Sequence, residues 1–289
     1  MKVLTQHAES VFSEKQKQSL LTLLNDEDPA VYLAVRERIL SFGEEALTWI
    51  RPHTLSRDPI LRRRALEIVR FFEQMAADTE FLQFCLTTGE NLDLEHGAFL
   101  LARTEFPEIN VAAYQALLDS YASDIRETLL HQAQPEAIIA TMNEFVFTKQ
   151  EFCGNESNYY DPENSYLNRV MDRKKGNPIN LCLLYLLLAR RLNLPMTGIG
   201  LPGHFICRFQ DASEAFYIDV FNQGRILTKT DCIHYLIQTP SGYRRDFLAP
   251  MASRRILMRI CANLHLIYIR MHAAEESKRL HSYVVALSR

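Results

Sequence analysis

The sequence lacks the signals that direct a chain to or through a membrane. The 289-residue chain starts "MKVLTQHAESVFSEKQKQ", where no apolar segment follows the early lysine. Its longest apolar run, residues 179–189, is interrupted at Asn180 and falls far short of the roughly 20 residues that cross a bilayer. These absences predict a cytoplasmic protein with no membrane partner.

An excess of basic residues is also missing. The chain has 32 Lys and Arg against 35 Asp and Glu, for a net charge of −3. Nothing therefore attracts it generally to phosphate backbones or anionic lipid, and no helix combines a basic face with a DNA-reading pattern. We expect no nucleic-acid partner.

The six cysteines form no C-x-x-C pair and most lie inside apolar stretches: Cys85, Cys153, Cys182, Cys207, Cys232 and Cys261. This usage is typical of reduced, buried thiols in the cytoplasm, without disulfides. A structural zinc site needs close ligand pairs, which are absent. The sequence predicts no metal site and no cofactor.

Residues 9 to about 130 show consecutive amphipathic helical patterns. "DPAVYLAVRERIL" from 28 and "DPILRRRALEIVR" from 58 both begin with Asp-Pro, which suits a helix N-cap followed by the first helical residue. Apolar residues then recur at matching offsets, which indicates two copies of a stacked-helix pattern. A further helical block, 94–129, is interrupted at Phe106-Pro107, with a new helix near Asn110.

The segment 153–178 is polar and predicts a loop with at most one short helix, bordering a site. A central helix follows it: Asn177 is a good N-cap, Pro178 suits the first position, and apolar residues run from Ile179 to Leu192. A helix apolar on all sides is expected to be buried.

Two strands come next, "TGIGLPGHFICRF" and "AFYIDVF", joined by the polar turn "QDASEA". Pairing Phe209 with Glu214 sets His204 opposite Asp219. Alternation then gives the sheet one apolar face and one face that carries His204, Asp219, Arg208 and Tyr217. From Tyr243 onward the pattern is helical again, with a break at 272–276 that predicts two antiparallel helices.

A histidine oriented by a carboxylate and placed near a thiol at a helix N-terminus is the arrangement of a cysteine nucleophile. The order helix with Cys, strand with His, next strand with Asp is that of the transglutaminase-like branch of the papain-type fold. Cys182, His204 and Asp219 are the candidate triad.

The stretches "NSYLNRVMDRKKGNPINLCLLYLLLARRLNLPMTGIGLPGHFICRF" and "FYIDVFNQGRILTKTDC" resemble the SirB-one family of bacterial invasion regulators. That family is a transglutaminase-like branch with a tetratricopeptide-like tail. The resemblance implies that His204 and Asp219 match the superfamily's catalytic pair. It also implies a missing nucleophile. Active members carry Cys two residues after a Gly, whereas here the residue two positions after Gly176 is Pro178.

Cys182 is the local substitute, one helical turn further on among leucines, where a buried inert thiol is the alternative to a nucleophile. Asn177, Pro178, Asn180, Arg208 and Tyr217 are candidate groove-lining residues. Their alternative roles are a helix cap, a loop contact and an ordinary solvated sheet face. In the tail, Leu264 and Tyr268 have tetratricopeptide spacing, but one degraded copy predicts only a helical hairpin.

Together these patterns predict an α+β protein: a helical N-terminal layer (1–135), a transglutaminase-like core with a central helix and antiparallel sheet (136–242), and a C-terminal helical pair (243–289). The favoured function is that of a non-catalytic, regulatory protein that binds a peptide or protein partner. One alternative is a thiol acyl-transfer enzyme, a protease or amidase, using Cys182, His204 and Asp219. Another is a helical scaffold with an incidental hairpin.

Overall fold

The computed structural model describes residues 13–129, 134–212 and 214–289. Its contacts divide the chain into two compact units, Met1–Ala76 and Ala77–Arg289. The division falls within helix α4 (Pro59–Thr87). The three segments anticipated from the sequence, with boundaries near 135 and 242, remain a prediction.

The first unit contains short helices and the start of a longer one. They are α1 (Glu14–Leu24), α2 (Pro29–Leu40), α3 (Glu45–Ile50), the 3-10 helix η1 (Arg51–Leu55) and the start of α4. Asp28 accepts a hydrogen bond from the Ala30 amide at 2.8 Å, and Asp58 accepts one from the Ile60 amide at 2.9 Å. Both Asp-Pro pairs therefore start helices, as the repeated pattern predicts.

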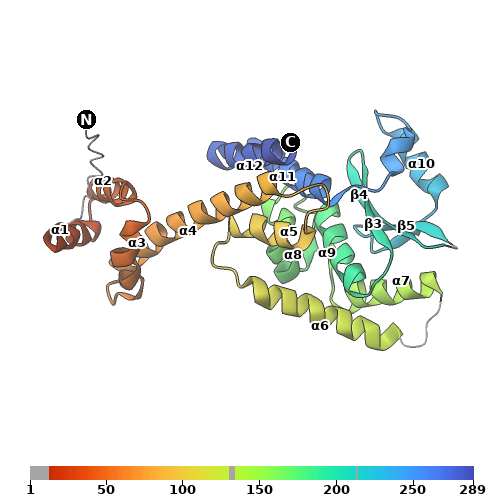
Figure 1. Cartoon of the computed structure of the whole chain (residues 1–289), viewed down its shortest axis with the longest axis horizontal. Coiled ribbons are helices and arrows are strands. Elements are labelled where there is room, and N and C mark those ends of the chain that lie inside the picture. Colours follow the sequence, from red (N-terminus) through yellow and green to blue (C-terminus); the bar gives the residue numbers. More distant parts are fainter. Residues whose placement is uncertain (1–12, 130–133, 213) are drawn as a thin grey trace, which may run out of the picture. The chain divides into compact units, whose positions relative to one another are not determined.

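The second unit holds the remaining helices and all strands (Figure 1). Its helical elements are α5 (Leu94–Arg103), α6 (Val111–Leu129), α7 (Pro135–Asn143), the π-helical η2 (Glu144–Lys149), η3 (Pro162–Ser165), α8 (Leu167–Arg173), α9 (Pro178–Arg191), α10 (Lys229–Gln238), η4 (Arg245–Leu248), α11 (Ser253–Arg270) and α12 (Ala274–Leu287). The break at Phe106-Pro107 separates α5 from α6, as expected.

Four antiparallel strands form the main sheet in the order β3-β4-β5-β6. They are β3 (Met196–Leu201), β4 (His204–Gln210), β5 (Ala215–Asp219) and β6 (Arg225–Leu227). The single strand predicted across 197–209 is thus a hairpin, β3 and β4. Its turn contains Gly203, whose φ of +73° suits a residue without Cβ.

The predicted pairing of the next hairpin is wrong by two residues. Phe209 pairs with Phe216, and Gln210 pairs with Ala215. Because side chains alternate with a period of two, a shift of two residues changes the partners but keeps every side chain on its predicted face. The division of the sheet into two faces therefore holds.

Helix α9 lies in the centre of the second unit, against the apolar face of the sheet (Figure 1). Leu183, Leu184 and Tyr185 are fully buried there, together with Phe205 and Cys207 of β4. The other face of the sheet carries a smaller apolar cluster, in which Ile206 and Tyr217 pack with Cys232 and Leu236 of α10. The sequence predicted one apolar face; α10 covers part of the second.

The polar segment 153–178 is more ordered than a loop. It contains η3, α8 and a two-residue parallel pair of β1 (Cys153–Gly154) with β2 (Lys175–Gly176). Buried amides hold it together: Asn155 donates to Asn164 at 2.9 Å, and Asn177 donates to Ser165 at 2.8 Å. The segment is thereby fixed against the N-terminal end of α9.

The architecture is α+β, mostly helical, with an antiparallel four-stranded sheet and a C-terminal helix pair, as predicted. Within the part of the chain that the structure describes, no helix has the length and apolar character required to cross a bilayer.

Candidate functional site

His204 and Asp219 form a direct pair at the edge of the sheet. His204 begins β4 and Asp219 ends β5, and His204 Nε2 lies 2.9 Å from Asp219 Oδ1. In the observed register the two residues are diagonal neighbours on one face, a separation that a ring side chain can span. The sequence thus predicted this pair correctly from a register that is itself wrong.

Asp219 is held in its charged form. Burial alone would raise the pKa of this carboxyl, but the hydrogen bonds from His204 and Asn222 outweigh burial and hold the pKa below its usual range. Asn222 Nδ2 donates to Asp219 Oδ2 at 2.8 Å. A carboxylate fixed in this way orients the imidazole of His204.

The depressed pKa of Asp219 makes its stabilising contribution dependent on pH. The contribution is complete above the unfolded-state pKa of about 3.9 and is lost as the pH falls through the folded-state pKa. We expect Asp219→Asn to lower the free energy of unfolding by about 2 kcal/mol at pH 7, and by much less near pH 3. Urea denaturation at both pH values measures the difference.

Asp246 provides the control for that comparison, because its ion pair with Arg244 is exposed. Asp246→Asn should change the free energy of unfolding by well under 1 kcal/mol at either pH, as surface pairs do. An Asp219→Asn defect of equal size at pH 7 and pH 3 would contradict the pH assignment.

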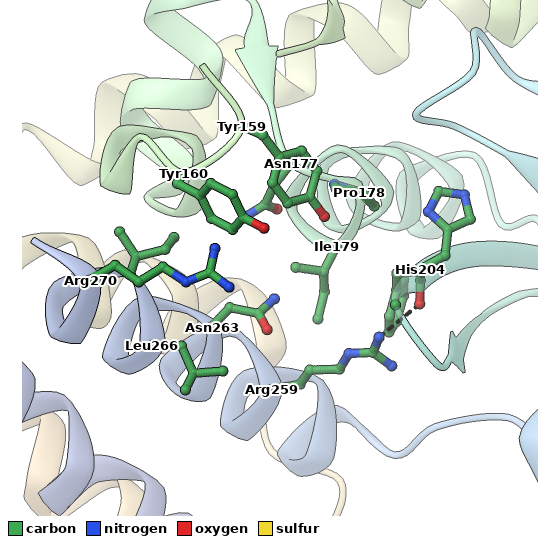
Figure 2. A pocket seen from close by; sticks show the side chains of 13 residues that line it. Tyr159, Tyr160, Asn177, Pro178, Ile179, His204, Arg259, Asn263, Leu266 and Arg270 are labelled. Carbon is green, nitrogen blue, oxygen red and sulfur yellow. Dashed lines mark hydrogen bonds between the residues drawn. The ribbon is translucent and has the colours of Figure 1, made fainter. Parts of the chain in front are cut away.

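A cavity of about 220 Å³ opens beside His204 (Figure 2). Four parts of the second unit line it: the N-terminal end of α9 with Asn177, Pro178 and Ile179, the β3–β4 turn with His204, one face of α11, and the segment before η3. Pro178 and His204 therefore border the same space. Proline provides no nucleophilic atom there.

Cys182 lies in the core. It is fully buried with Phe205 and Cys207, and its Sγ donates to the carbonyl of Phe205 at 3.4 Å. Burial is the main cause that raises the pKa of Cys182 well above its ordinary value, and the neighbouring Cys207 thiol raises it further. Such a thiol is predominantly protonated at neutral pH.

The structure separates the predicted groove residues. Asn177 and Pro178 line the cavity, but Asn180 is fully buried and its amide and side chain both donate to Asn177 Oδ1. Arg208 and Tyr217 line a different cavity of about 720 Å³ with Tyr243 and Arg245. Arg208 and Tyr217 share a sheet face with His204, as the alternation predicts. They pair with each other further along the strands and line a different cavity from the histidine.

Several cavity residues were not predicted from the sequence. Arg259, Asn263, Leu266 and Arg270 come from α11, and Tyr159 and Tyr160 from the polar segment before η3. The α11 residues recur at intervals of three or four, which places them along one helix face. Two arginines and an asparagine on that otherwise apolar face were the available signal.

A second cavity of about 500 Å³ lies on the other side of His204. Asp219, Asp231 and His234 line it with Tyr235, whose hydroxyl donates to the carbonyl of Pro202 at 2.9 Å. His204 thus lines two cavities of different character. Among the described residues, arginines and no carboxylate line the first, whereas Asp219 and Asp231 line the second together with Arg225.

No group of three or more His, Cys, Asp or Glu side chains suited to a metal ion occurs among the residues outside 1–12, 130–133 and 213. In the tail, Cys261 is fully buried, and His265 Nδ1 lies 3.0 Å from Ser277 Oγ. These residues stabilise the α11–α12 pair.

The comparisons with known proteins agree with this geometry. Residues 112–262, just over half of the chain, match a family model described as the transglutaminase-like superfamily. The chain belongs to this superfamily. The matched range contains α9, the whole sheet and the first half of α11.

Relatives refine the assignment. A UPF0162 protein of Xylella fastidiosa (strain 9a5c) is 33% identical over 204 residues, which are 68% of this chain and 73% of the relative. The chain is therefore also a member of the UPF0162 family. Similarity extends to F-box only protein 21 of Homo sapiens, 35% identical over 108 residues, which cover 35% of this chain but 17% of that protein. No solved structure gives a significant match.

Proposed function

We propose that this transglutaminase-like protein is not a thiol enzyme and that it binds a peptide or protein segment in the cavity beside His204. The observation that carries the proposal is the identity of the residue at the head of α9: Pro178, two residues after Gly176, borders the cavity where the superfamily's catalytic cysteine is expected. His204 and Asp219 retain their pairing without a nucleophile to activate.

The environment of Cys182 supports this proposal. A nucleophilic thiol must reach its base and ionise near neutral pH. The Cys182 thiol instead donates to a backbone carbonyl and lies among apolar side chains that raise its pKa. We also propose that the chain belongs to the SirB-one family, a proposal that the P-G-H-F and I-D-x-F motifs at 202–205 and 218–221 support.

The character of the cavity wall also supports binding. Leu266 is 57% exposed beside the polar groups of His204 and Asn263. A concave site that combines apolar walls with a few converging polar groups is the usual form of a recognition site. The partner is expected to insert an extended segment, because a volume of about 220 Å³ is too small for one helical turn, which is about 10 Å wide and about 5.4 Å long.

Selection from a displayed random-peptide library on the full-length protein tests this function. Peptides that bind the wild type should lose at least about tenfold in affinity for Leu266→Glu, which replaces an apolar side chain of the cavity wall by a negative charge. Ile269→Glu is the matched control, because Ile269 is 49% exposed on the same helix but outside the cavity. Failure to recover any peptide sensitive to Leu266→Glu but insensitive to Ile269→Glu would count against the proposal.

A further inference from the structure

The cavity contains a partly buried cation without a counter-charge. Arg259 Nη2 donates to the carbonyls of Leu201 at 2.6 Å and His204 at 2.8 Å, so the guanidinium is fixed against the β3–β4 turn. Its carbon lies 5.5 Å from the centre of the Phe205 ring. Throughout the described ranges, no carboxylate pairs with Arg259, although buried charges in proteins are normally paired.

A second guanidinium faces the same space. Arg270 stacks over the ring of Tyr160 at 4.0 Å and, like Arg259, forms no ion pair with a described residue. Figure 2 shows Asn263 between the two arginines on the same face of α11. No Asp or Glu is found among the described residues that line this cavity, so its potential is positive.

Apolar side chains complete part of the wall. Leu266 and Ile267 come from α11, the helix that carries both arginines, and Ile179 comes from α9. The volume of about 220 Å³ corresponds to roughly seven water molecules at about 30 Å³ each. Space of this size suits a carboxylate together with one or two adjoining apolar groups.

We propose that this cavity binds a carboxylate of a peptide segment, with Arg259 and Arg270 as its charge partners and Asn263 as an additional hydrogen-bond donor. The carboxylate belongs either to the C-terminus of the peptide or to an acidic side chain. Because guanidinium groups bind carboxylates through paired N–H donors, removal of the negative charge should reduce affinity strongly. This inference rests on the proposed function, since it names the chemistry of the segment that the cavity accepts.

Titration of three synthetic peptides, followed by NMR chemical shifts of the full-length protein, tests the inference. The probes are N-acetyl-leucyl-leucine, its C-terminal amide, and N-acetyl-leucyl-glutamyl-leucinamide. We expect at least one carboxylate probe to bind about tenfold or more tightly than the neutral amide. Preference between the two acidic probes distinguishes a C-terminal from a side-chain carboxylate.

Variants assign the effect to the arginines. Arg259→Gln and Arg270→Gln should each weaken the preferred acidic probe by about tenfold, whereas Arg255→Gln, an exposed control on the same helix, should leave affinity within about twofold. Arg270 contacts the Tyr160 ring rather than the backbone of the β3–β4 turn, so Arg270→Gln keeps the test valid if Arg259→Gln unfolds that turn. Arg259→Lys, which keeps the charge, should restore part of the affinity.

Several results would overturn the inference. One is equal affinity for the acidic and the amide probes, and another is an equal loss of affinity in Arg270→Gln and Arg255→Gln. A third is displacement of the preferred acidic probe by inorganic phosphate more readily than by acetate. If neutral peptides bind as well as acidic ones and remain sensitive to Leu266→Glu, the carboxylate inference fails and the proposed function stands. If no peptide of any charge depends on Leu266, both fail.

Discussion

A thiol placed at position 178 should become a reactive thiolate. In Pro178→Cys, the new side chain occupies the first turn of the 14-residue helix α9, where the macrodipole favours negative charge, and it borders the cavity that holds His204. The His204 imidazole, which Asp219 orients, can then form a thiolate–imidazolium ion pair with the introduced thiol. We expect the pKa of the introduced thiol to lie about 1 to 2 units below the usual value of about 8.5.

The pH midpoint of iodoacetamide labelling, resolved by peptide mass spectrometry, measures this pKa. Pro29→Cys is the matched control, since Pro29 is also the first residue of a capped helix, α2, but belongs to the other unit. The midpoint is the proper comparison because Pro29 is exposed and Pro178 is buried, so absolute rates differ. Equal labelling midpoints in the two variants would contradict this expectation. A lowered midpoint that persists after His204→Ala would show that His204 does not lower the pKa of the introduced thiol.

Loss of the Arg254 side chain should cause a large loss of stability. Arg254 is 7% exposed, and its guanidinium donates to four carbonyls: Cys85 and Thr88 at the end of α4, and Ala286 and Leu287 at the end of α12. The last carbonyls of a helix have no partner within the helix, so this one side chain satisfies two helix ends.

Arg254→Met keeps the apolar stem but leaves those buried acceptors unpaired. The expected loss in free energy of unfolding is about 3 to 5 kcal/mol, measured by urea denaturation. Arg255→Met, at the exposed neighbouring position, should change it by less than about 0.5 kcal/mol. Similar small effects in the two variants would mean that water or other groups replace the Arg254 donors.

The parts of the fold that depend on local chemistry were predictable from the sequence. Asn177 caps α9 by accepting from the Asn180 amide at 3.0 Å, and Pro178 is the first residue of the helix, as the Asn-Pro signal predicts. The helix pair α11–α12 and the break before α6 follow from equally local signals. Each requires only a few adjacent residues and a helical period.

Features set by packing were not predictable in the same way. Strand β3 contains Gly198 and Gly200, which weaken its strand pattern, and the side chain of Met251, distant in sequence, lies in the space that a Cβ at Gly200 would enter. The register of β4 and β5 was misjudged because alternation constrains the faces but not a shift of two residues.

The candidate site was predicted in part for the same reason. His204, Asp219, Asn177 and Pro178 are close in sequence or share one hairpin, and the structure brings them to one end of α9. Arg259 and Arg270 reach the cavity only because α11 returns across the head of α9. The contribution of these two arginines to the cavity can therefore be recognised only from the tertiary structure.

Cys182 lies in the core, and we propose that the cavity beside His204 is a binding site rather than a thiol active site. The most direct test is the pH dependence of iodoacetamide labelling at Cys182 in the native protein, compared with His204→Ala and with the urea-unfolded chain. We expect no native labelling near neutral pH, no effect of His204→Ala, and full labelling only after unfolding, because Cys182 is fully buried and its pKa is raised. Rapid native labelling that slows in His204→Ala would contradict this proposal and identify Cys182 as an activated nucleophile.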